Sequence, residues 1–240
     1  MKRILITAFE PFGEDKINPT AEIIRVLPDR IILSGDQNCG SADRFALGGS
    51  QDSRSADRFA LGSSQDSGSA DREAELIKLV LPVSFIRAPQ IAEAAVVEHS
   101  PDAVISLGLA GGRAAVTPER IAVNCMDARM PDNDGYLPED LPIVPDGPAA
   151  YFSTLPIKKI RDAVRAGGIP SEISNSAGTY VCNAVMYRML YLAAKVDGRM
   201  RCGFIHVPYS ESMGKTPALT LDEEIKAVKM SVEAVICSDF

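Results

Sequence analysis

Short apolar runs typical of β-strands alternate along this chain with segments that have the apolar periodicity of an amphipathic helix. The strand-like runs cover residues 3–7, 76–83, 103–109, 120–124, 172–176 and 202–207; the helical patterns cover 18–27, 89–99, 156–168 and 220–236, and another begins near residue 182. This alternation predicts an α/β fold, a three-layer α/β/α sandwich with a mixed, largely parallel sheet. Ligands of such a sheet are expected beyond the carboxyl ends of its strands.

Residues at the expected helix ends support this assignment. Asn18 is a suitable N-cap for the first helix, and Pro19 suits its first turn. Thr220 and Glu223 have the spacing of a capping box at the start of the last helix. The chain therefore carries helix start signals where the periodicity requires them.

Residues 40–67 do not fit the alternation. They read GSADRFALGGSQDS followed by RSADRFALGSSQDS, so a 14-residue unit occurs twice in tandem. A solenoid needs more copies of a longer unit that can stack, and the segment is rich in Ser, Asp, Gly and Gln. We expect a flexible, duplicated loop insertion with no part in the chemistry, within a single domain that spans residues 1–240.

Charge and cysteine usage exclude several functional classes. The net charge of −7 argues against binding to nucleic acid or to an anionic membrane. The amino-terminal segment has only a short apolar run, broken at Glu10 and Pro11, which predicts a cytoplasmic protein. Five scattered cysteines without a CxxC pair indicate free thiols rather than a disulfide framework or a zinc site.

A cysteine and a histidine are the best candidates for catalysis. Cys182 begins a helical apolar stripe, a position typical of a core residue, but the first turn of a helix also stabilises a thiolate. His206 lies at the carboxyl end of strand 202–207, whereas His99 is expected to cap a helix end. Cys182 would act as nucleophile and His206 as general base. The spacing leaves the third member open among the acidic residues Glu119, Asp127 and Asp132.

Other catalytic motifs are absent or incomplete. The sequence contains no GxSxG, HExxH or GxGxxG. The segment SMGKT at 212–216 lacks the first glycine of a P-loop, since Tyr209 stands there. The segment GLAGGR at 108–113 is either a tight turn or an anion cradle. Two alternatives stay open. One is a phosphate-dependent, nucleoside phosphorylase-like transferase, which the glycine-rich turn and the α/β layering would also serve; the other is a noncatalytic binding protein, disabled by the duplicated loop.

Several long motifs occur together and in a fixed order. They are TAFEPFGEDKINPT, GLAGGRAAVTPERIAVNCMDARMPDNDG, GPAAYFSTLPIKKI, SAGTYVCNAVMYRML and GFIHVPY. In these segments the chain resembles the pyroglutamyl peptidase (pyrrolidone carboxyl peptidase) family of cysteine peptidases. The resemblance implies an omega peptidase that hydrolyses the amide bond after an amino-terminal pyroglutamyl residue. It further implies pyroglutamyl peptides as substrates, a homotetramer, and no metal or organic cofactor.

The resemblance also assigns residues to roles. It implies that Cys182, His206 and Glu119 form the catalytic triad and that Arg129 lies beside the cysteine. The pocket for the lactam ring is implied to consist of Phe9, Phe12, Asn18, Met130, Tyr180 and Val181. Because a pyroglutamyl group is small, flat and uncharged, apolar walls and a few amide hydrogen bonds should bind it.

Overall fold

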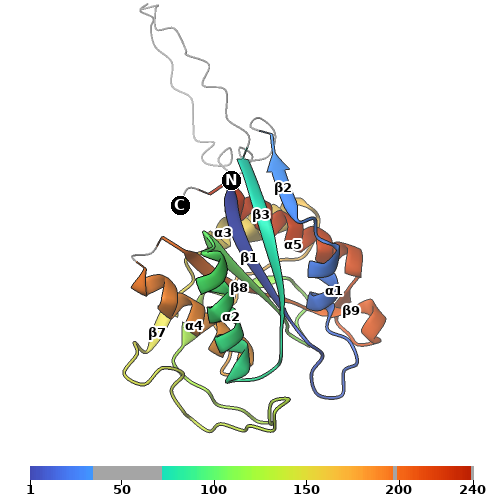
Figure 1. Ribbon diagram of the computed structural model, residues 1–240. Helices are drawn as coiled ribbons and strands as arrows, with labels where there is room; N and C mark the ends of the chain where they lie inside the picture. The colour runs from blue at the N-terminus through green and yellow to red at the C-terminus, as the bar shows by residue number, and fades with distance from the viewer. Residues whose placement is uncertain (35–71, 197–198, 239–240) are drawn as a thin grey trace, which may run out of the picture.

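The computed structural model describes residues 1–34, 72–196 and 199–238 and contains one six-stranded sheet (Figure 1). Its strands are β1 (Lys2–Phe9), β2 (Arg30–Leu33), β3 (Arg72–Leu81), β4 (Ala103–Leu109), β5 (Thr117–Pro118) and β8 (Arg201–Val207). They lie in the order β2-β3-β1-β4-β8-β5. The duplicated segment at residues 40–67 lies outside the described residues, so its expected flexibility stays a prediction.

The centre of the sheet is parallel and its edges are antiparallel. Strand β1 pairs in parallel with β3 and β4, and β4 pairs in parallel with β8. The edge strands β2 and β5 run antiparallel to β3 and β8. Two further pairs lie apart from this sheet: β6 (Ile121–Val123) with β7 (Ala150–Phe152), and β9 (Tyr209–Ser210) with β10 (Ala218–Leu219). The predicted mixed, largely parallel sheet is confirmed.

Helices cover both faces of the sheet (Figure 1). They are α1 (Pro19–Val26), α2 (Arg87–His99), α3 (Ile157–Ala166), α4 (Val181–Lys195) and α5 (Leu221–Ile236), with a short 3-10 helix, η1, at Glu211–Met213. Side chains alternate along β1: Ile4 and Ile6 pack in a core with α1, α3 and α5, whereas Leu5 packs in a second core with α2 and α4. The two cores confirm the three-layer sandwich.

The expected start signals of two helices are present. Asn18 is the N-cap of α1, and its Oδ1 accepts a hydrogen bond from the backbone N–H of Thr20 at 3.1 Å. Thr220 and Glu223 form a complete capping box at the start of α5. These local rules hold because they depend on residues only three or four positions apart.

Strand predictions were less accurate than helix predictions. Residues 172–176 do not form a strand, because this largely exposed segment pairs with its neighbours through single hydrogen bonds and an isolated bridge, Glu119 with Ser174, and not through a continuous ladder. The run predicted at 76–83 belongs to β3, which begins four residues earlier and ends at Leu81. Several short strands were missed, since two to four residues give too little alternation to recognise: β2, β5, β7, β9 and β10.

The expectation of five free thiols is wrong. Cys125, Cys182 and Cys202 are free, but Cys237, directly after α5, is disulfide-bonded. Sequence spacing gave no sign of this pairing, because the fold and not the spacing decides which cysteines meet. None of the helices in the described ranges is both long enough and apolar enough to cross a membrane.

Candidate active site

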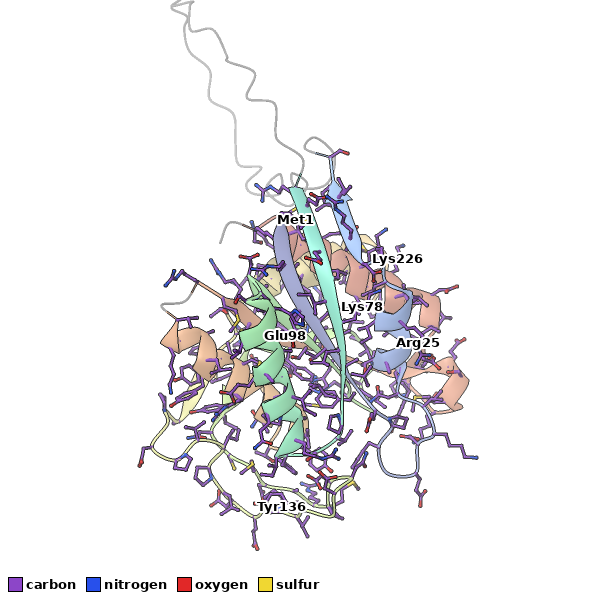
Figure 2. All side chains as sticks on the ribbon, viewed as in Figure 1. Met1, Arg25, Lys78, Glu98, Tyr136 and Lys226 are labelled. Carbon is purple, nitrogen blue, oxygen red and sulfur yellow. The ribbon has the colours of Figure 1, made fainter. Side chains whose placement is uncertain are left out.

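A small cavity opens at the carboxyl ends of the central strands, where the sheet topology predicts a ligand site. Its volume is about 150 Å³, and it is lined by Phe9, Phe12, Asp15, Ile17, Asn18, Val83, Leu109, Tyr180, Val181 and Cys182. Pockets for drug-sized ligands span ~300–1,000 Å³, so this cavity suits a group the size of one residue. Figure 2 shows Tyr136, from the loop that follows β6, at the same end of the molecule, opposite Met1.

The candidate nucleophile stands at the beginning of a helix. Cys182 is the second residue of α4 and is half-buried. The N-cap residue, Tyr180, makes no side-chain capping bond, so its side chain leaves the amides of the first turn without a cap. Gly108 on β4 lies directly below the sulfur: a Cβ built there would stand 2.9 Å from Sγ of Cys182. The thiol therefore packs against the carboxyl end of β4.

Asn183 anchors the first turn of α4 to a neighbouring strand. Its side chain is fully buried, and its Oδ1 accepts a hydrogen bond from the backbone N–H of Val123 at 2.9 Å. Its Nδ2 donates to the carbonyls of Val123 at 2.9 Å and Cys125 at 3.0 Å. Three bonds to one backbone segment fix the position of the residue after Cys182, a role that sequence reasoning missed.

A histidine and a glutamate meet beside this cysteine. His206, on β8, is paired in register with Gly108 on β4 and with Thr117 on β5. Its Nδ1 lies 2.7 Å from Oε1 of Glu119, whose side chain is fully buried. Because Gly108 faces both the sulfur of Cys182 and the strand position of His206, the three side chains converge at one end of the sheet.

The structure distinguishes the three carboxylates that the spacing left open. Only Glu119, among these three, contacts His206. Asp132 is buried and accepts backbone N–H bonds at 2.9 Å from three residues, Phe85, Asp134 and Tyr136. Asp127 is exposed. Asp132 therefore orders a loop near the cavity wall, and Glu119 is the carboxylate that can orient the imidazole.

Electrostatics favour an ionised glutamate and a neutral imidazole. Burial alone would raise the pKa of Glu119, but hydrogen bonds and charge from His206, with Ser174 and Arg113, hold that pKa below its ordinary value. Burial lowers the pKa of His206, and the nearby Arg113 adds to this, although Glu119 opposes it. At neutral pH the imidazole is therefore uncharged and can accept a proton.

The expected thiolate is not favoured in the resting site. Burial, together with the negative charge of Glu119, raises the pKa of Cys182 to about 12, although Arg113 and a backbone hydrogen bond pull it down. Desolvation outweighs the helix N-terminus, an effect that position in the sequence cannot reveal. At neutral pH, Cys182 is a neutral thiol.

Five of the residues expected to form the substrate pocket line the cavity: Phe9, Phe12, Asn18, Tyr180 and Val181. The ring centroids of Phe12 and Tyr180 are 5.2 Å apart, and those of Phe85 and Tyr180 are 5.0 Å apart. The hydroxyl of Tyr180 donates to the carbonyl of Pro131 at 3.0 Å. These contacts hold the aromatic wall in place.

Arg129 and Met130 are not among the residues that line the cavity. Both side chains are exposed, Met130 to 51%. Their roles beside the cysteine and in the pocket wall therefore stay predictions. The arginine that the structure brings to the histidine–glutamate pair is Arg113, whose Nη1 lies 2.6 Å from Oε1 of Glu119.

Sequence reasoning also missed several lining residues. Ile17, Val83 and Leu109 are ordinary apolar residues in loops or at strand ends, and no sequence signal separates them from the core. Asp15 lines the same cavity, and its carboxylate accepts a hydrogen bond from Lys215 at 2.5 Å. Within the described part of the chain, no cluster of three or more His, Cys, Asp or Glu side chains is arranged to hold a metal ion.

Comparison with known proteins points to one family. The family model described as "Pyroglutamyl peptidase" matches residues 60–238. The pyrrolidone-carboxylate peptidase of Thermococcus onnurineus is 40% identical over 234 residues, which cover 96% of this chain and 97% of that protein. The enzyme of the same name from Streptococcus pneumoniae is 37% identical over 238 residues, covering 98% and 92% of the two chains.

Solved structures agree with the sequence relatives. The pyroglutamyl peptidase I of Bacillus amyloliquefaciens superposes with a TM-score of 0.78 at 31% identity, covering 99% of this chain and 98% of that one. The pyrrolidone carboxyl peptidase of Thermococcus litoralis superposes with a TM-score of 0.76 at 38% identity, covering 98% and 93%. The similarity therefore extends over the whole fold and includes the strands and the helix that carry the candidate site.

Proposed function

Because the chain belongs to the pyroglutamyl peptidase family, we propose that Cys182, His206 and Glu119 are the triad with which it removes amino-terminal pyroglutamyl residues from peptides. The protein is a cysteine-type omega peptidase. The observation that carries the assignment of the triad is the 2.7 Å contact between Nδ1 of His206 and Oε1 of Glu119. This bond engages one ring nitrogen and leaves Nε2 as the base.

The reaction begins with attack of Sγ of Cys182 on the pyroglutamyl carbonyl carbon. The thiol is neutral at rest, so its proton passes to Nε2 of His206 as the carbon–sulfur bond forms, and Glu119 stabilises the resulting imidazolium. His206 then protonates the leaving amine as the peptide bond breaks. Water then gives a proton to His206 and attacks the thioester carbon; the carbon–sulfur bond breaks, His206 returns the proton to Sγ of Cys182, and pyroglutamate leaves.

The first turn of α4 supports the tetrahedral intermediate. The backbone N–H of Cys182 lies in this turn, whose amides have no side-chain cap, and can donate to the oxyanion. A single donor of this kind typically contributes ~3 kcal/mol to transition-state stabilisation. Asn183, fixed by three hydrogen bonds, keeps the turn in place for this purpose.

The cavity accounts for recognition of the lactam ring. Phe9, Phe12 and Val181 offer apolar surface to an uncharged ring, in a volume of about 150 Å³ that suits one residue. Hydrogen bonds to the lactam would discriminate against proline, which has the ring without the carbonyl, because the partners of that carbonyl would then be left unpaired.

The alternatives that the sequence left open are not favoured. Family membership and a histidine–glutamate pair beside a cysteine support a peptidase over a noncatalytic binding protein. In the GLAGGR segment, the guanidinium of Arg113 is bound to Glu119, and Gly111 packs directly against the ring of Tyr209. Gly108 and Gly111 therefore serve close packing, Gly112 serves the turn with its φ of +85°, and the arginine is not available to a phosphate.

The assembly, location and partners are further parts of this proposal. The net charge of −7 supports a protein that binds neither nucleic acid nor anionic membranes. Three free thiols, Cys125, Cys182 and Cys202, support a cytoplasmic location, whereas the disulfide-bonded Cys237 is the exception among the described cysteines. The homotetramer rests on the resemblance to the family, and light scattering of the purified protein tests it directly.

The test of the triad is hydrolysis of a chromogenic pyroglutamyl amide beside the matching prolyl amide. Wild type should release product from the first substrate and at least ~100-fold less from the second. Cys182→Ala should abolish turnover while circular dichroism shows an intact fold. A wild type without activity, or a Cys182→Ala variant that matches it, would contradict the proposal.

A further inference from the structure

One arginine, Arg113, contacts the glutamate of the histidine–glutamate pair. Nη1 of Arg113 lies 2.6 Å from Oε1 of Glu119, the same oxygen that Nδ1 of His206 approaches to 2.7 Å. Nη1 also donates to Oγ1 of Thr117 at 2.6 Å. One carboxylate oxygen is therefore held between a guanidinium and an imidazole.

The backbone around Arg113 places it there. The chain leaves β4 through a tight turn in which the N–H of Arg113 donates to the carbonyl of Ala110 at 3.3 Å. Gly112 has φ +85° in this turn, a conformation that favours glycine. The chain then enters β5, where Thr117 pairs in register with His206. The glycine turn thus brings the guanidinium back to the strand that faces the catalytic histidine.

A buried carboxylate needs a compensating charge. Glu119 is fully buried, and its side chain forms ion pairs with two groups, Arg113 and His206, in the described ranges. His206 is neutral at neutral pH, since burial lowers its pKa. The permanent positive charge beside Glu119 is therefore that of Arg113.

We infer that Arg113 is a positioning residue for the hydrolysis: it keeps Glu119 ionised, so that Nδ1–H of His206 donates to Oε1 and Nε2 stays free to take the proton of Cys182. This inference rests on the proposed triad. Among the described residues its guanidinium bonds to Thr117, Glu119 and Ser176 and not to the sulfur, so Arg113 acts through Glu119 and through its own charge. An arginine also suits the role because its guanidinium stays charged at every pH at which the enzyme works.

The charge of Arg113 also sets the pH at which the histidine–glutamate pair gains a proton. The charged groups that act on His206 are Glu119 and Arg113, both from the segment after β4. Its neighbours Gly108 on β4 and Phe204 on β8 carry no charge. Without the guanidinium, the His206–Glu119 pair gains its additional proton at a higher pH. This holds whether that proton lies on the imidazole or on the carboxylate.

The test compares the pH dependence of kcat/KM in four proteins: wild type, Arg113→Met, Arg113→Gln and Arg113→Lys. The acid limb is the fall of kcat/KM toward low pH. In Arg113→Met this limb should move to higher pH by about one unit. At pH values on the acid limb, the variant should therefore hydrolyse the pyroglutamyl amide about tenfold more slowly than wild type. At higher pH the difference should be smaller. Arg113→Gln keeps a hydrogen-bond donor without the charge, so it should shift in the same way and carries the test if the methionine variant does not fold.

Arg113→Lys keeps the charge and should move the limb by less than half as much. Arg120→Met is the matched control: its guanidinium is next to Glu119 in sequence but donates to Oδ1 of Asn175 at 2.7 Å, so its removal should leave the limb in place. A merely structural arginine would lower folded yield without moving the limb. An unchanged limb in Arg113→Met, or an equal shift in the lysine variant, would overturn the inference.

A second readout needs no turnover. The chain has only two histidines, His99 and His206, so nitrogen-15 spectra of the imidazoles can follow His206. The signals that disappear in His206→Asn are those of His206. Wild type should show the tautomer protonated at Nδ1, and its titration should move up in Arg113→Met. An inactive wild type would contradict the proposed function, whereas an active wild type with an unmoved His206 titration would contradict only the role of Arg113.

Discussion

Gly108 and Cys182 meet across the floor of the candidate site, so closely that a Cβ on the glycine would stand 2.9 Å from Sγ. The same Cβ would lie 2.7 Å from the ring of Phe204, which in turn lies 4.7 Å from the imidazole of His206, centroid to centroid. Glycine at this position thus lets Sγ of Cys182 lie close against β4, next to the paired position of His206 on β8. A strand glycine of this kind marks close approach and not flexibility.

Gly108→Ala should therefore displace the thiol or the Phe204 ring. We expect kcat on the pyroglutamyl amide to fall ~10- to 100-fold, because small misplacements of reacting groups have large effects, and the free energy of unfolding to fall by ~1–3 kcal/mol through overpacking. Gly167→Ala is the control, since a Cβ there would meet the flexible end of Met230, far from the site, at 2.5 Å. A kcat equal to that of wild type in Gly108→Ala would contradict this prediction, because the thiol and the Phe204 ring would then have made room for the methyl group.

Alkylation of Cys182 tests the state of the thiol. Since burial raises its pKa to about 12, the thiolate is a minor species at neutral pH. The rate of reaction with iodoacetamide should rise about tenfold per pH unit, without a plateau below about pH 10. Cys182→Ala, which retains Cys125 and Cys202, supplies the background rate. A plateau near neutral pH would instead indicate a thiolate–imidazolium pair.

Phe12 should affect binding more than chemistry. Its ring packs 5.2 Å from that of Tyr180, centroid to centroid, in the cavity wall. In Phe12→Ala we expect KM for the pyroglutamyl amide to rise ~5- to 10-fold with little change in kcat, because the lost apolar contact acts equally on substrate and transition state. Phe152→Ala removes a ring that is 68% exposed and should leave KM unchanged. A fall in kcat at constant KM would place Phe12 in the chemistry.

The fold could be predicted from sequence because its signals are local. Alternating apolar periods, the Asn18 cap and the Thr220 capping box each depend on residues a few positions apart, and the structure has all of them. The strand predicted at 172–176 is wrong because this segment is largely exposed and has a single apolar residue, Ile173, to bury. A strand is stabilised by burial of at least one of its faces, and that burial depends on the whole fold and not on the local sequence.

The candidate site was only partly visible in the sequence. Motif resemblance indicated Cys182, His206 and Glu119, and geometry now shows the last two in contact. The pKa of the Cys182 thiol was expected to be low from its helix position and a nearby histidine, whereas burial raises it. Arg113 was hidden in a glycine turn that local rules explain completely, because its partner, Glu119, is identified only by the tertiary fold.

Glu224 should make stability depend on pH. It is fully buried on α5, and neither of its carboxyl oxygens has a hydrogen-bond partner in the described part of the protein. Burial raises its pKa from 4.5 to about 8. The folded state therefore keeps a proton that the unfolded chain releases above pH 4.5. The stabilising contribution is complete below that pH and is lost progressively up to about pH 8, at ~1.4 kcal/mol per pH unit.

Urea denaturation at about pH 5, 6.5 and 8 measures this dependence. Glu224→Gln has no proton to lose, so the free energy of unfolding should change less across this window than in wild type. The matched control is Glu223→Gln on the same turn of α5. Hydrogen bonds from Thr220 lower the pKa of Glu223, so its contribution is present at high pH and is lost on acidification, the opposite sign. If wild type and Glu224→Gln had parallel pH dependence, the buried carboxyl would be ionised in the folded state, and a compensating cation would have to reach it.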